Sequence, residues 1–250
     1  MSKEMKVIIV IPARYKSSRF EGKPLAKILG KPMVLRVCDL CAAAIEKENI
    51  YVATDDKRIK DKVEEAGYKS IMTSDGHLTG TDRIAEVSDL VDADIYINVQ
   101  GDEPIVDPKD ILKIIKEKIE YPNFVIKGYS KIRNDENPDN LNIVKVVFNE
   151  KNKLVYMSRS RLPGSKNSSF VESGYNKAVC IYAFNKGELK AFSEFGRKSV
   201  LEKIEDIEIL RFLDLGIDVR LVETNSDSLA VDEEADILKV EKYLLKNNRI

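Results

Sequence analysis

The sequence predicts an α/β protein with a doubly wound, mostly parallel sheet and a small inserted lobe. Residues 7–13 form a continuous apolar, β-branched run that ends in a polar loop, which is typical of a strand buried on both faces of a parallel sheet. A helical pattern over residues 33–44 and a second strand over 50–53 complete a strand, helix, strand unit. Units of this kind pack helices on both faces of one sheet, so they favour this fold class.

The remaining elements follow from hydrophobic periodicity and from the turn residues between them. Further strands are expected over residues 69–72, 95–99, 179–184 and 217–222. Further helices are expected over residues 58–66, 81–90, 200–215 and 233–245. The pattern loosens beyond Tyr129, where residues 133–142 are polar and residues 164–174 are rich in Ser, Asn and Gly. We therefore expect one domain over residues 1–250, with an inserted lobe at about 130–180.

The composition narrows the classes of function. The 250 residues carry 41 basic and 42 acidic side chains, so bulk charge gives no reason to expect a nucleic acid partner. The apolar run before Arg14 is too short to span a membrane and lacks a signal-peptide cleavage context. We expect a soluble, cytoplasmic protein. Cys38, Cys41 and Cys180 lack zinc-type spacing, and core packing explains them better than redox or metal chemistry.

The first strand is followed by a loop that suits a phosphate-rich ligand. Four basic residues, small hydroxyl residues and a glycine lie between Arg14 and Lys23, and such a loop can surround a triphosphate with cations and backbone N–H groups. The chain contains neither G-x-x-x-x-G-K-[ST] nor G-x-G-x-x-G, which excludes the P-loop and dinucleotide-binding motifs. A solvated basic loop without a ligand is the alternative.

Acidic side chains follow another expected strand. Residues 100–103 come directly after the strand over 95–99, and ligands of open parallel sheets bind outside the carboxyl ends of the strands. A carboxylate such as Asp102 can hold magnesium there, because this ion favours one or two carboxylates together with phosphate oxygens. A tight turn is the alternative. Asp232 opens the last helix and, taken alone, is best explained as an N-cap.

Residues 77–83 form the entry to the helix over 81–90. This Gly- and Thr-containing entry either binds a base or sugar through backbone donors or simply caps the helix. His77 is the only histidine in the chain, which disfavours a Ser-His-Asp or Cys-His mechanism and a multi-histidine zinc site. If the chain is an enzyme, its chemistry therefore rests on metals and cations.

Together these segments resemble the KDO (3-deoxy-manno-octulosonate) cytidylyltransferase family, which activates this sugar acid as CMP-KDO for lipopolysaccharide. The resemblance covers nearly the whole chain and implies a Rossmann-like fold of the nucleotide-diphospho-sugar transferase type. Its ordered series of motifs is Ile11-Pro-Ala-Arg14-Tyr15, Ser17-Ser18-Arg19, Gly22-Lys23-Pro24, Ala53-Thr54-Asp55-Asp56, Gly80-Thr81-Asp82-Arg83, Asn98-Val99-Gln100-Gly101-Asp102-Glu103-Pro104 and Val231-Asp232.

The resemblance also implies a set of site residues. The implied CTP-binding residues are Ala13, Arg14, Ser18, Arg19, Lys23, Thr81, Arg83, Gln100 and Asp102. The implied sugar-binding residues are Gln100, Glu103, Tyr182, Glu205 and Glu208. Asp102 and Asp232 match the magnesium-binding aspartates of the family, and with Arg14 and Lys23 they form the implied catalytic set. The implied reaction is in-line attack by the anomeric hydroxyl of a 2-keto-3-deoxy sugar acid on the α-phosphorus of CTP, which releases pyrophosphate. Alignment and charge neutralisation can drive it without a histidine base.

The chain departs from the family pattern mainly on the acceptor side. Leu78, Lys177, Ala178 and Ile209 stand where the family usually has Gln, Arg, His and Gln. Lost hydrogen-bonding groups change discrimination between hydroxylated substrates. The acceptor is therefore KDO, a related acid such as an amino-KDO, or a smaller acidic or phosphonate acceptor.

Two further alternatives come from other classes of function. A nucleotidyltransferase for sugar 1-phosphates typically opens with a longer glycine-rich loop, so the loop at residues 14–23 disfavours it. A decayed nucleotide-binding module has little need for both Asp102 and Asp232. The resemblance also implies a homodimer that forms through the inserted lobe and nearby helices. The apolar helix expected over 200–215 belongs either to that interface or to the core.

Overall fold

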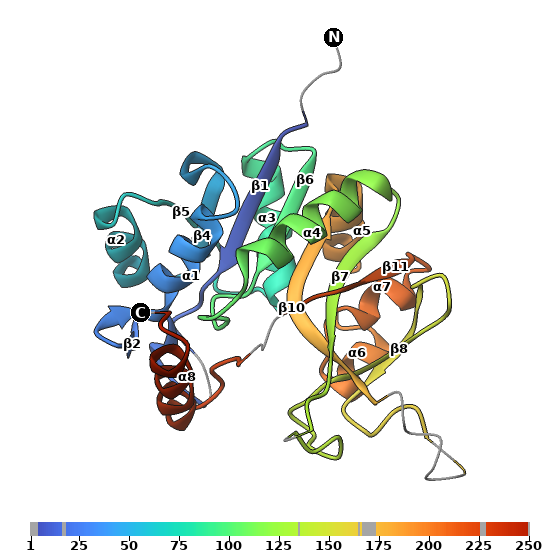
Figure 1. The fold of residues 1–250 in the computed structure, drawn as a ribbon. Helices are drawn as coiled ribbons and strands as arrows, with labels where there is room; N and C mark the ends of the chain where they lie inside the picture. The colour runs from blue at the N-terminus through green and yellow to red at the C-terminus, as the bar shows by residue number, and fades with distance from the viewer. Residues whose placement is uncertain are drawn as a thin grey trace.

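The computed structural model describes residues 5–16, 19–134, 136–164, 166, 174–225 and 229–249. Within these residues nine strands form one sheet, in which seven follow the order β11-β7-β10-β6-β1-β4-β5 and β8 and β9 extend it beside the start of β10 (Figure 1). The strands of this sheet are β1 (Val7–Pro12), β4 (Ile50–Thr54), β5 (Lys69–Met72), β6 (Ile95–Val99), β7 (Val125–Lys131), β8 (Lys145–Phe148), β9 (Leu154–Ser158), β10 (Asn176–Phe184) and β11 (Val219–Glu223). A separate ribbon pairs β2 (Lys27–Ile28) with β3 (Lys31–Pro32).

Four of the six pairings along the seven-stranded order are parallel. The pairs β6–β1, β1–β4, β4–β5 and β11–β7 are parallel. β10 runs antiparallel to both of its long neighbours, β6 and β7. The prediction of a mostly parallel sheet is therefore confirmed, and the carboxyl ends of β1, β4 and β6 lie at one edge.

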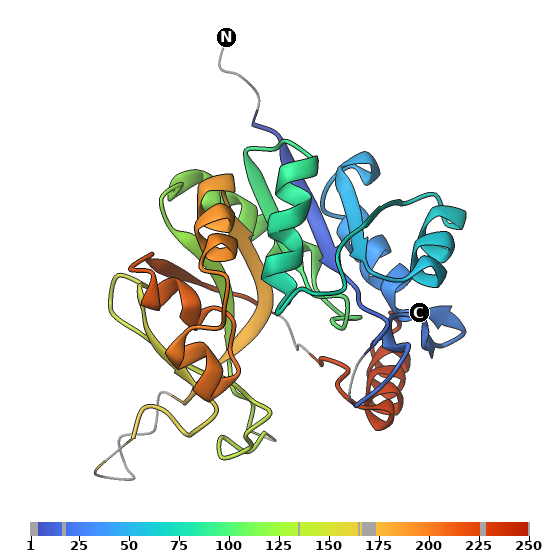
Figure 2. The same ribbon diagram turned by 180° about the vertical axis from the view of Figure 1, so that it is seen from behind.

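Alternation along β1 explains why helices cover both faces. Ile9 and Ile11 belong to one buried core cluster, whereas Ile8 and Val10 belong to a second cluster on the opposite face, because successive side chains of a strand point in opposite directions. The helices are α1 (Met33–Ala42), α2 (Lys57–Glu65), α3 (Gly80–Leu90), α4 (Pro108–Glu120), α5 (Lys186–Glu194), α6 (Val200–Glu205), α7 (Leu210–Asp214) and α8 (Glu234–Lys246). The first core includes α1, α2 and α4, and the second includes α3, α5 and α7 (Figures 1 and 2).

The prediction of core packing for the cysteines holds for two of them. Cys38 and Cys41 on α1 are buried in the first core cluster without a disulfide. Burial raises the pKa of the Cys38 thiol to about 12. Cys180 on β10 is only partly buried, and it lines a hollow described below.

The prediction of a single helix over residues 200–215 is wrong. The chain forms two short helices, α6 and α7, because Asp206 adopts the left-handed conformation with φ of 52° and ends α6. Arg159 holds the end of α6, donating from Nε to the carbonyl of Glu205 at 2.7 Å and from Nη2 to the carbonyl of Asp206 at 3.1 Å. A side chain 46 residues away thus satisfies carbonyls that a continuing helix would have bonded internally.

Several elements were not expected from the sequence. They are α4, α5, β7 and the short strands β2 and β3, and also β8 and β9, which lie in the region predicted as an inserted lobe. The described part of this region joins the main sheet, since β8 pairs with β10 where Lys145 faces Lys177. The lobe therefore continues the sheet along the first residues of β10.

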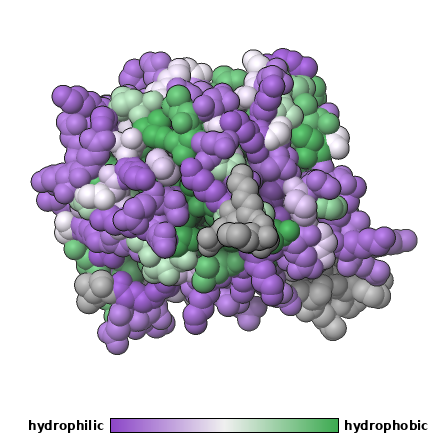
Figure 3. Space-filling view, turned by 90° about the horizontal axis from the view of Figure 1, so that it is seen from above, coloured by the Kyte–Doolittle hydropathy of each residue, from purple (hydrophilic) through white to green (hydrophobic). Residues whose placement is uncertain are grey.

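The surface at the beginning of β1 is mostly hydrophilic, with hydrophobic side chains gathered in small groups (Figure 3). No helix among the described residues combines the length and the apolar character that a membrane crossing requires.

A buried guanidinium joins α3 to α6 and α7. Arg211 is fully buried and donates to both carboxylate oxygens of Glu202 at 2.7 Å and to Oδ1 of Asp82 at 2.7 Å. Asp82 in turn accepts from Oγ1 of Thr79, the residue that caps α3. This network fixes the first turn of α3 against the segment that precedes α7.

Arg211→Met is expected to lower the free energy of unfolding by about 3–5 kcal/mol, because it leaves the carboxylates of Asp82 and Glu202 buried without their cation. Urea unfolding monitored by circular dichroism measures the change. Lys190→Met removes an exposed pair with Glu194 and is the control, with an expected change of about 0.5 kcal/mol or less. A loss below about 1 kcal/mol for Arg211→Met would contradict this role.

Candidate active site

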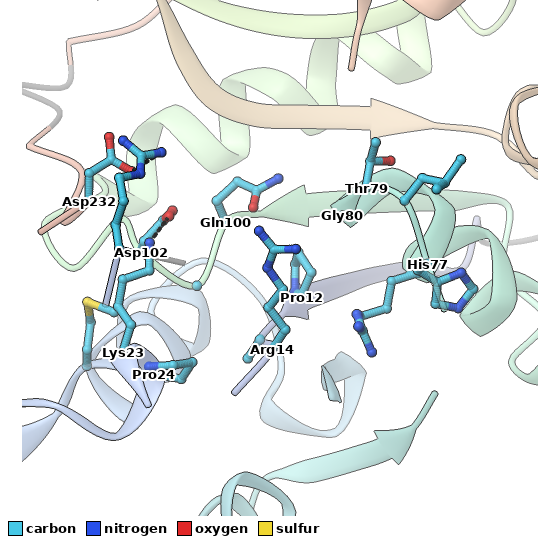
Figure 4. Close-up of a pocket in the computed structure, with 16 residues that line it drawn as sticks. Pro12, Arg14, Lys23, Pro24, His77, Thr79, Gly80, Gln100, Asp102 and Asp232 are labelled. Atoms are coloured by element: carbon cyan, nitrogen blue, oxygen red, sulfur yellow. Dashed lines mark hydrogen bonds and ion pairs between the residues drawn. The ribbon is translucent and has the colours of Figure 1, made fainter. Parts of the chain in front are cut away.

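Two adjoining hollows open at the carboxyl ends of β1 and β6. The smaller has a volume of about 260 Å³ and the larger about 960 Å³. They share eight lining residues, and Figure 4 shows most of these side chains around the smaller hollow. The shared residues are Arg14, Arg19, Leu78, Thr79, Gly80, Gln100, Asp102 and Asp232. The strand ends therefore present one continuous polar site, as the sheet topology predicts.

The basic loop after β1 folds back onto the strand. Gly22 has a φ of 70° and donates its N–H to the carbonyl of Tyr15 at 2.9 Å. A Cβ atom at this glycine would lie 3.1 Å from the Tyr15 ring, so the close turn requires glycine. The turn brings Lys23 to the site, where its Nζ donates to Oδ2 of Asp102 at 2.7 Å and to the carbonyl of Val231 at 2.8 Å.

Backbone contacts place the two predicted metal-binding aspartates in the same hollow. A Cβ atom at Gly101 would lie 2.8 Å from the carbonyl oxygen of Pro12, so only glycine lets the turn after β6 approach the end of β1 so closely. The next residue, Asp102, accepts at its carbonyl a hydrogen bond of 3.0 Å from the N–H of Val231. Asp232 follows directly and lines both hollows. The tight turn, which was the alternative explanation of these residues, is thus present, and it also places the carboxylate of Asp102 in the site.

The N-cap explanation of Asp232 is wrong. The N-cap of α8 is Glu233. Oδ2 of Asp236, within the first turn, accepts from the N–H groups of Asp232 and Glu233 at 3.0 Å each. The carboxylate of Asp232 is therefore free of helix capping and contacts Nη2 of Arg19 at 3.7 Å instead.

The donor set at this edge fits a divalent cation that is shared with a phosphate-bearing ligand. Asp102 and Asp232 offer two carboxylates, and the described residues contain no group of three or more His, Cys, Asp or Glu side chains that could hold a metal ion by itself. Two carboxylates suit a hard cation that completes its shell with phosphate and water oxygens. The Arg19–Asp232 pair is half-exposed and contributes at most about 1 kcal/mol, so Arg19 can move to a phosphate at little cost.

The entry to α3 borders the smaller hollow. Thr79 caps the helix by accepting from the N–H of Asp82 at 3.3 Å, so the capping alternative is confirmed for this residue. Gly80 lines both hollows, and a Cβ atom there would lie 3.2 Å from Nε2 of Gln100. Arg83 lines the smaller hollow while its Nη2 donates to Oδ2 of Asp55 at 3.0 Å.

The structure gathers most of the expected CTP-binding residues but not all of them. Those that line the smaller hollow are Ala13, Arg14, Arg19, Lys23, Arg83, Gln100 and Asp102. Thr81 does not line it, because its side chain is fully buried and its N–H donates to Oε2 of Glu208 at 3.0 Å. Ser18 lies outside the described residues.

Most of the expected sugar-binding residues lie in the larger hollow. Of the expected sugar-binding residues, Gln100, Glu103, Tyr182 and Glu208 line it. Glu205 does not: its carboxylate accepts from Oγ of Ser158 at 2.7 Å and from the N–H of Arg159 at 2.9 Å, which ties β9 to α6. Burial raises the pKa of Glu208, an effect that the hydrogen bond from Thr81 partly opposes.

Sequence reasoning missed several cations of the larger hollow. They are Lys127, Arg133, Arg159, Lys198 and Lys239. One signal in the sequence could have found Lys127, since it directly follows the apolar, β-branched residues Val125 and Ile126. Lys177 and Ala178, which were noted as departures from the family pattern, also line this hollow.

A mostly parallel sheet with a cationic loop and two aspartates at its carboxyl edge defines an α/β nucleotidyltransferase. The family profile Cytidylyltransferase matches residues 8–221. The chain belongs to this cytidylyltransferase family.

Curated relatives and solved structures agree with this assignment. The chain is 38% identical to the 3-deoxy-manno-octulosonate cytidylyltransferase of Escherichia coli, over 94% of each chain. It is 40% identical to the 8-amino-3,8-dideoxy-manno-octulosonate cytidylyltransferase of Shewanella frigidimarina, over 96% of this chain and 99% of the relative. A structure of CMP:2-keto-3-deoxy-manno-octonic acid synthetase complexed with CTP superposes with a TM-score of 0.89 at 38% identity and covers 97% of this chain and 99% of its own. A cytidylyltransferase from Leptospira borgpetersenii, at 15% identity and a TM-score of 0.61, covers 98% of this chain and 96% of its own and shares the fold.

Asp102→Asn is expected to lower the turnover number with CTP by about 100-fold or more, because it removes a carboxylate that would hold the cation neutralising the reacting phosphate. The dissociation constant of CTP is expected to change by less than about threefold, since the loop cations still bind the phosphates. Pyrophosphate release and calorimetric titration of CTP measure the two effects. Asp92→Asn, at an exposed pair with Lys186, is the control. An unchanged turnover number for Asp102→Asn would contradict the catalytic role of Asp102.

Proposed function

We propose that this chain transfers CMP from CTP to the anomeric hydroxyl of 3-deoxy-manno-octulosonate, or of a closely related 2-keto-3-deoxy sugar acid, and releases pyrophosphate. The observation that carries the proposal is the contact between Lys23 and Asp102 at 2.7 Å, where a cation-lined hollow meets a larger one. The relatives that match nearly the whole chain bear the names of enzymes for this acid or its 8-amino analogue.

The residues of the smaller hollow bind the nucleotide in this proposal. Arg14, Arg19 and Lys23 neutralise the triphosphate, because guanidinium and ammonium groups bind phosphate oxygens through charge-assisted hydrogen bonds. A side chain at Gly80 would crowd Gln100, and one at Gly101 would crowd the carbonyl of Pro12. Glycine at both positions therefore lets the backbone lie close to the ligand. Phosphoryl-type transfer depends mainly on such positioning and charge neutralisation.

Asp102 and Asp232 would hold magnesium, which when bound supplies further neutralisation of phosphate charge and favours ionisation of the attacking hydroxyl. In the transfer, a bond forms between the anomeric oxygen and the α-phosphorus, and the bond from that phosphorus to pyrophosphate breaks. The hydroxyl proton leaves to water. Lys23 Nζ, held by the carbonyl of Val231 at 2.8 Å, stays beside the departing phosphates.

We also propose that the chain forms a homodimer through the region near residues 130–180 and the adjoining α6. Val200 and Ile204 lie on one side of α6 with 64% and 74% of their surfaces exposed, and Leu141 in the neighbouring loop is 62% exposed. Apolar side chains grouped in this way favour a protein interface. Sedimentation velocity that gives only a monomer at micromolar concentration would overturn this part of the proposal.

The test of the proposed reaction is pyrophosphate release with CTP, magnesium and a panel of acids: 3-deoxy-manno-octulosonate, its 8-amino analogue, neuraminic acids and small phosphonates. Turnover with 3-deoxy-manno-octulosonate is expected, and Asp102→Asn is the negative control. Turnover only with another acid would mean that Leu78, Lys177 and Ala178 have redefined the acceptor. CTP binding without turnover on any acid would instead favour a nucleotide-binding module.

A further inference from the structure

Lys127 is a buried cation on the acceptor side of the site. It lies in the middle of β7, only 1% of its surface is exposed, and it lines the larger hollow. Its Nζ donates to the carbonyl of Val179 at 3.3 Å and lies 4.0 Å from the centre of the Tyr182 ring. No carboxylate among the described residues comes within 4.0 Å of this ammonium.

The other buried lysines are satisfied far better. Lys118 donates to both oxygens of Glu188 at 2.7 Å. Lys145 donates to the carbonyls of Asn140 and Ile143 at 3.0 and 2.6 Å and also contacts that of Arg159. Lys177 pairs with Glu136 at 2.5 Å. An ammonium can donate three hydrogen bonds, and a buried charge is costly unless it is paired, so Lys127 has donors available for a ligand.

The surroundings of Lys127 keep it charged at neutral pH. Burial lowers its pKa to about 8, while Cys180, Glu208 and Glu103 oppose that effect. β10 presents Cys180 and Tyr182 to it, the turn after β6 presents Glu103, the segment before α7 presents Glu208, and Leu221 faces it from β11. The nearby acids therefore favour the ammonium without forming an ion pair with it.

We propose that Lys127 binds the carboxylate of the acceptor acid and so places the neighbouring anomeric hydroxyl at the reacting phosphorus. This inference rests on the proposed function. In a 2-keto acid the carboxylate is bonded directly to the anomeric carbon, so fixing the carboxylate also fixes the hydroxyl. The turn over residues 100–103 is hydrogen-bonded to β10, the strand beside Lys127, because the N–H of Gln100 donates to the carbonyl of Cys180 at 3.4 Å.

Lys127→Met tests the proposal by removing the charge while keeping most of the side-chain volume. With saturating CTP, the KM for 3-deoxy-manno-octulosonate is expected to rise about 10- to 100-fold, because a charge-assisted hydrogen bond is lost. The KM for CTP is expected to stay within about twofold. Lys153→Met is the control, because Lys153 lines neither hollow and pairs with Asp218 at 2.7 Å; the KM of this variant for the acid is expected to be unchanged.

Two measurements on the wild-type chain separate binding of the acid from a structural role, and they decide the proposal even if Lys127→Met fails to fold. The wild type is expected to prefer the free acid over its methyl ester by about 10-fold or more, a preference that Lys127→Met loses. Its KM for the acid is expected to rise above about pH 8, as the ammonium of Lys127 loses its proton, whereas the KM of the variant stays flat.

The outcomes distinguish this proposal from the proposed function. Equal KM values for wild type and Lys127→Met, or a wild type that accepts acid and ester alike, overturn the role of Lys127 and leave the transfer reaction intact. A wild type that releases no pyrophosphate with any acid of the panel overturns both.

Discussion

The buried guanidinium of Arg211 is the interaction on which the geometry of the site depends. It is fully buried, and it holds Glu202 on α6 and Asp82 on α3 at 2.7 Å each. Charges this deep are tolerated only when they are paired and hydrogen-bonded, so the three side chains specify one arrangement of their helices. The entry to α3 lines the smaller hollow, and the segment before α7 carries Glu208, which lines the larger one. Because Thr81 donates to Glu208 at 3.0 Å, the two sides of the site are also linked directly.

The charged residues of the site lie where these helices meet the ends of β1 and β6. Gly22 and Gly101 allow two turns to approach closely, and these turns carry Lys23 and Asp102 into contact at 2.7 Å. A lysine that can bind phosphate oxygens and a carboxylate that would hold a cation both suit a reaction whose barrier falls when phosphate charge is neutralised. The acceptor hollow differs, because its deepest cation, Lys127, lacks a close carboxylate among the described residues. We infer that the substrate itself completes that part of the site.

Local sequence predicted the elements whose pattern is set by near neighbours. The run that becomes β1, the helix α3 and the acidic turn after β6 are each encoded in consecutive residues, and the structure contains all three. The failures depend on distant partners. The helix expected over residues 200–215 is divided into two, and Arg159 donates hydrogen bonds to the carbonyls of Glu205 and Asp206 at the division. The burial of Lys127 was not predicted, since it depends on β10 and β11, which begin 49 or more residues after it in the chain.

The central claim is that the anomeric oxygen of the acid attacks the α-phosphorus of CTP. It is tested most directly by an acceptor labelled with ¹⁸O at the anomeric hydroxyl, with ³¹P NMR of the products in unlabelled water. The account predicts that the label is retained in the bond between the sugar and CMP, which shifts the phosphorus signal of the CMP ester, while pyrophosphate carries none. Loss of label beyond the exchange that the free acid undergoes with water in the same buffer would show that the carbon–oxygen bond breaks during turnover, and it would contradict the mechanism proposed for Lys23, Asp102 and the two hollows.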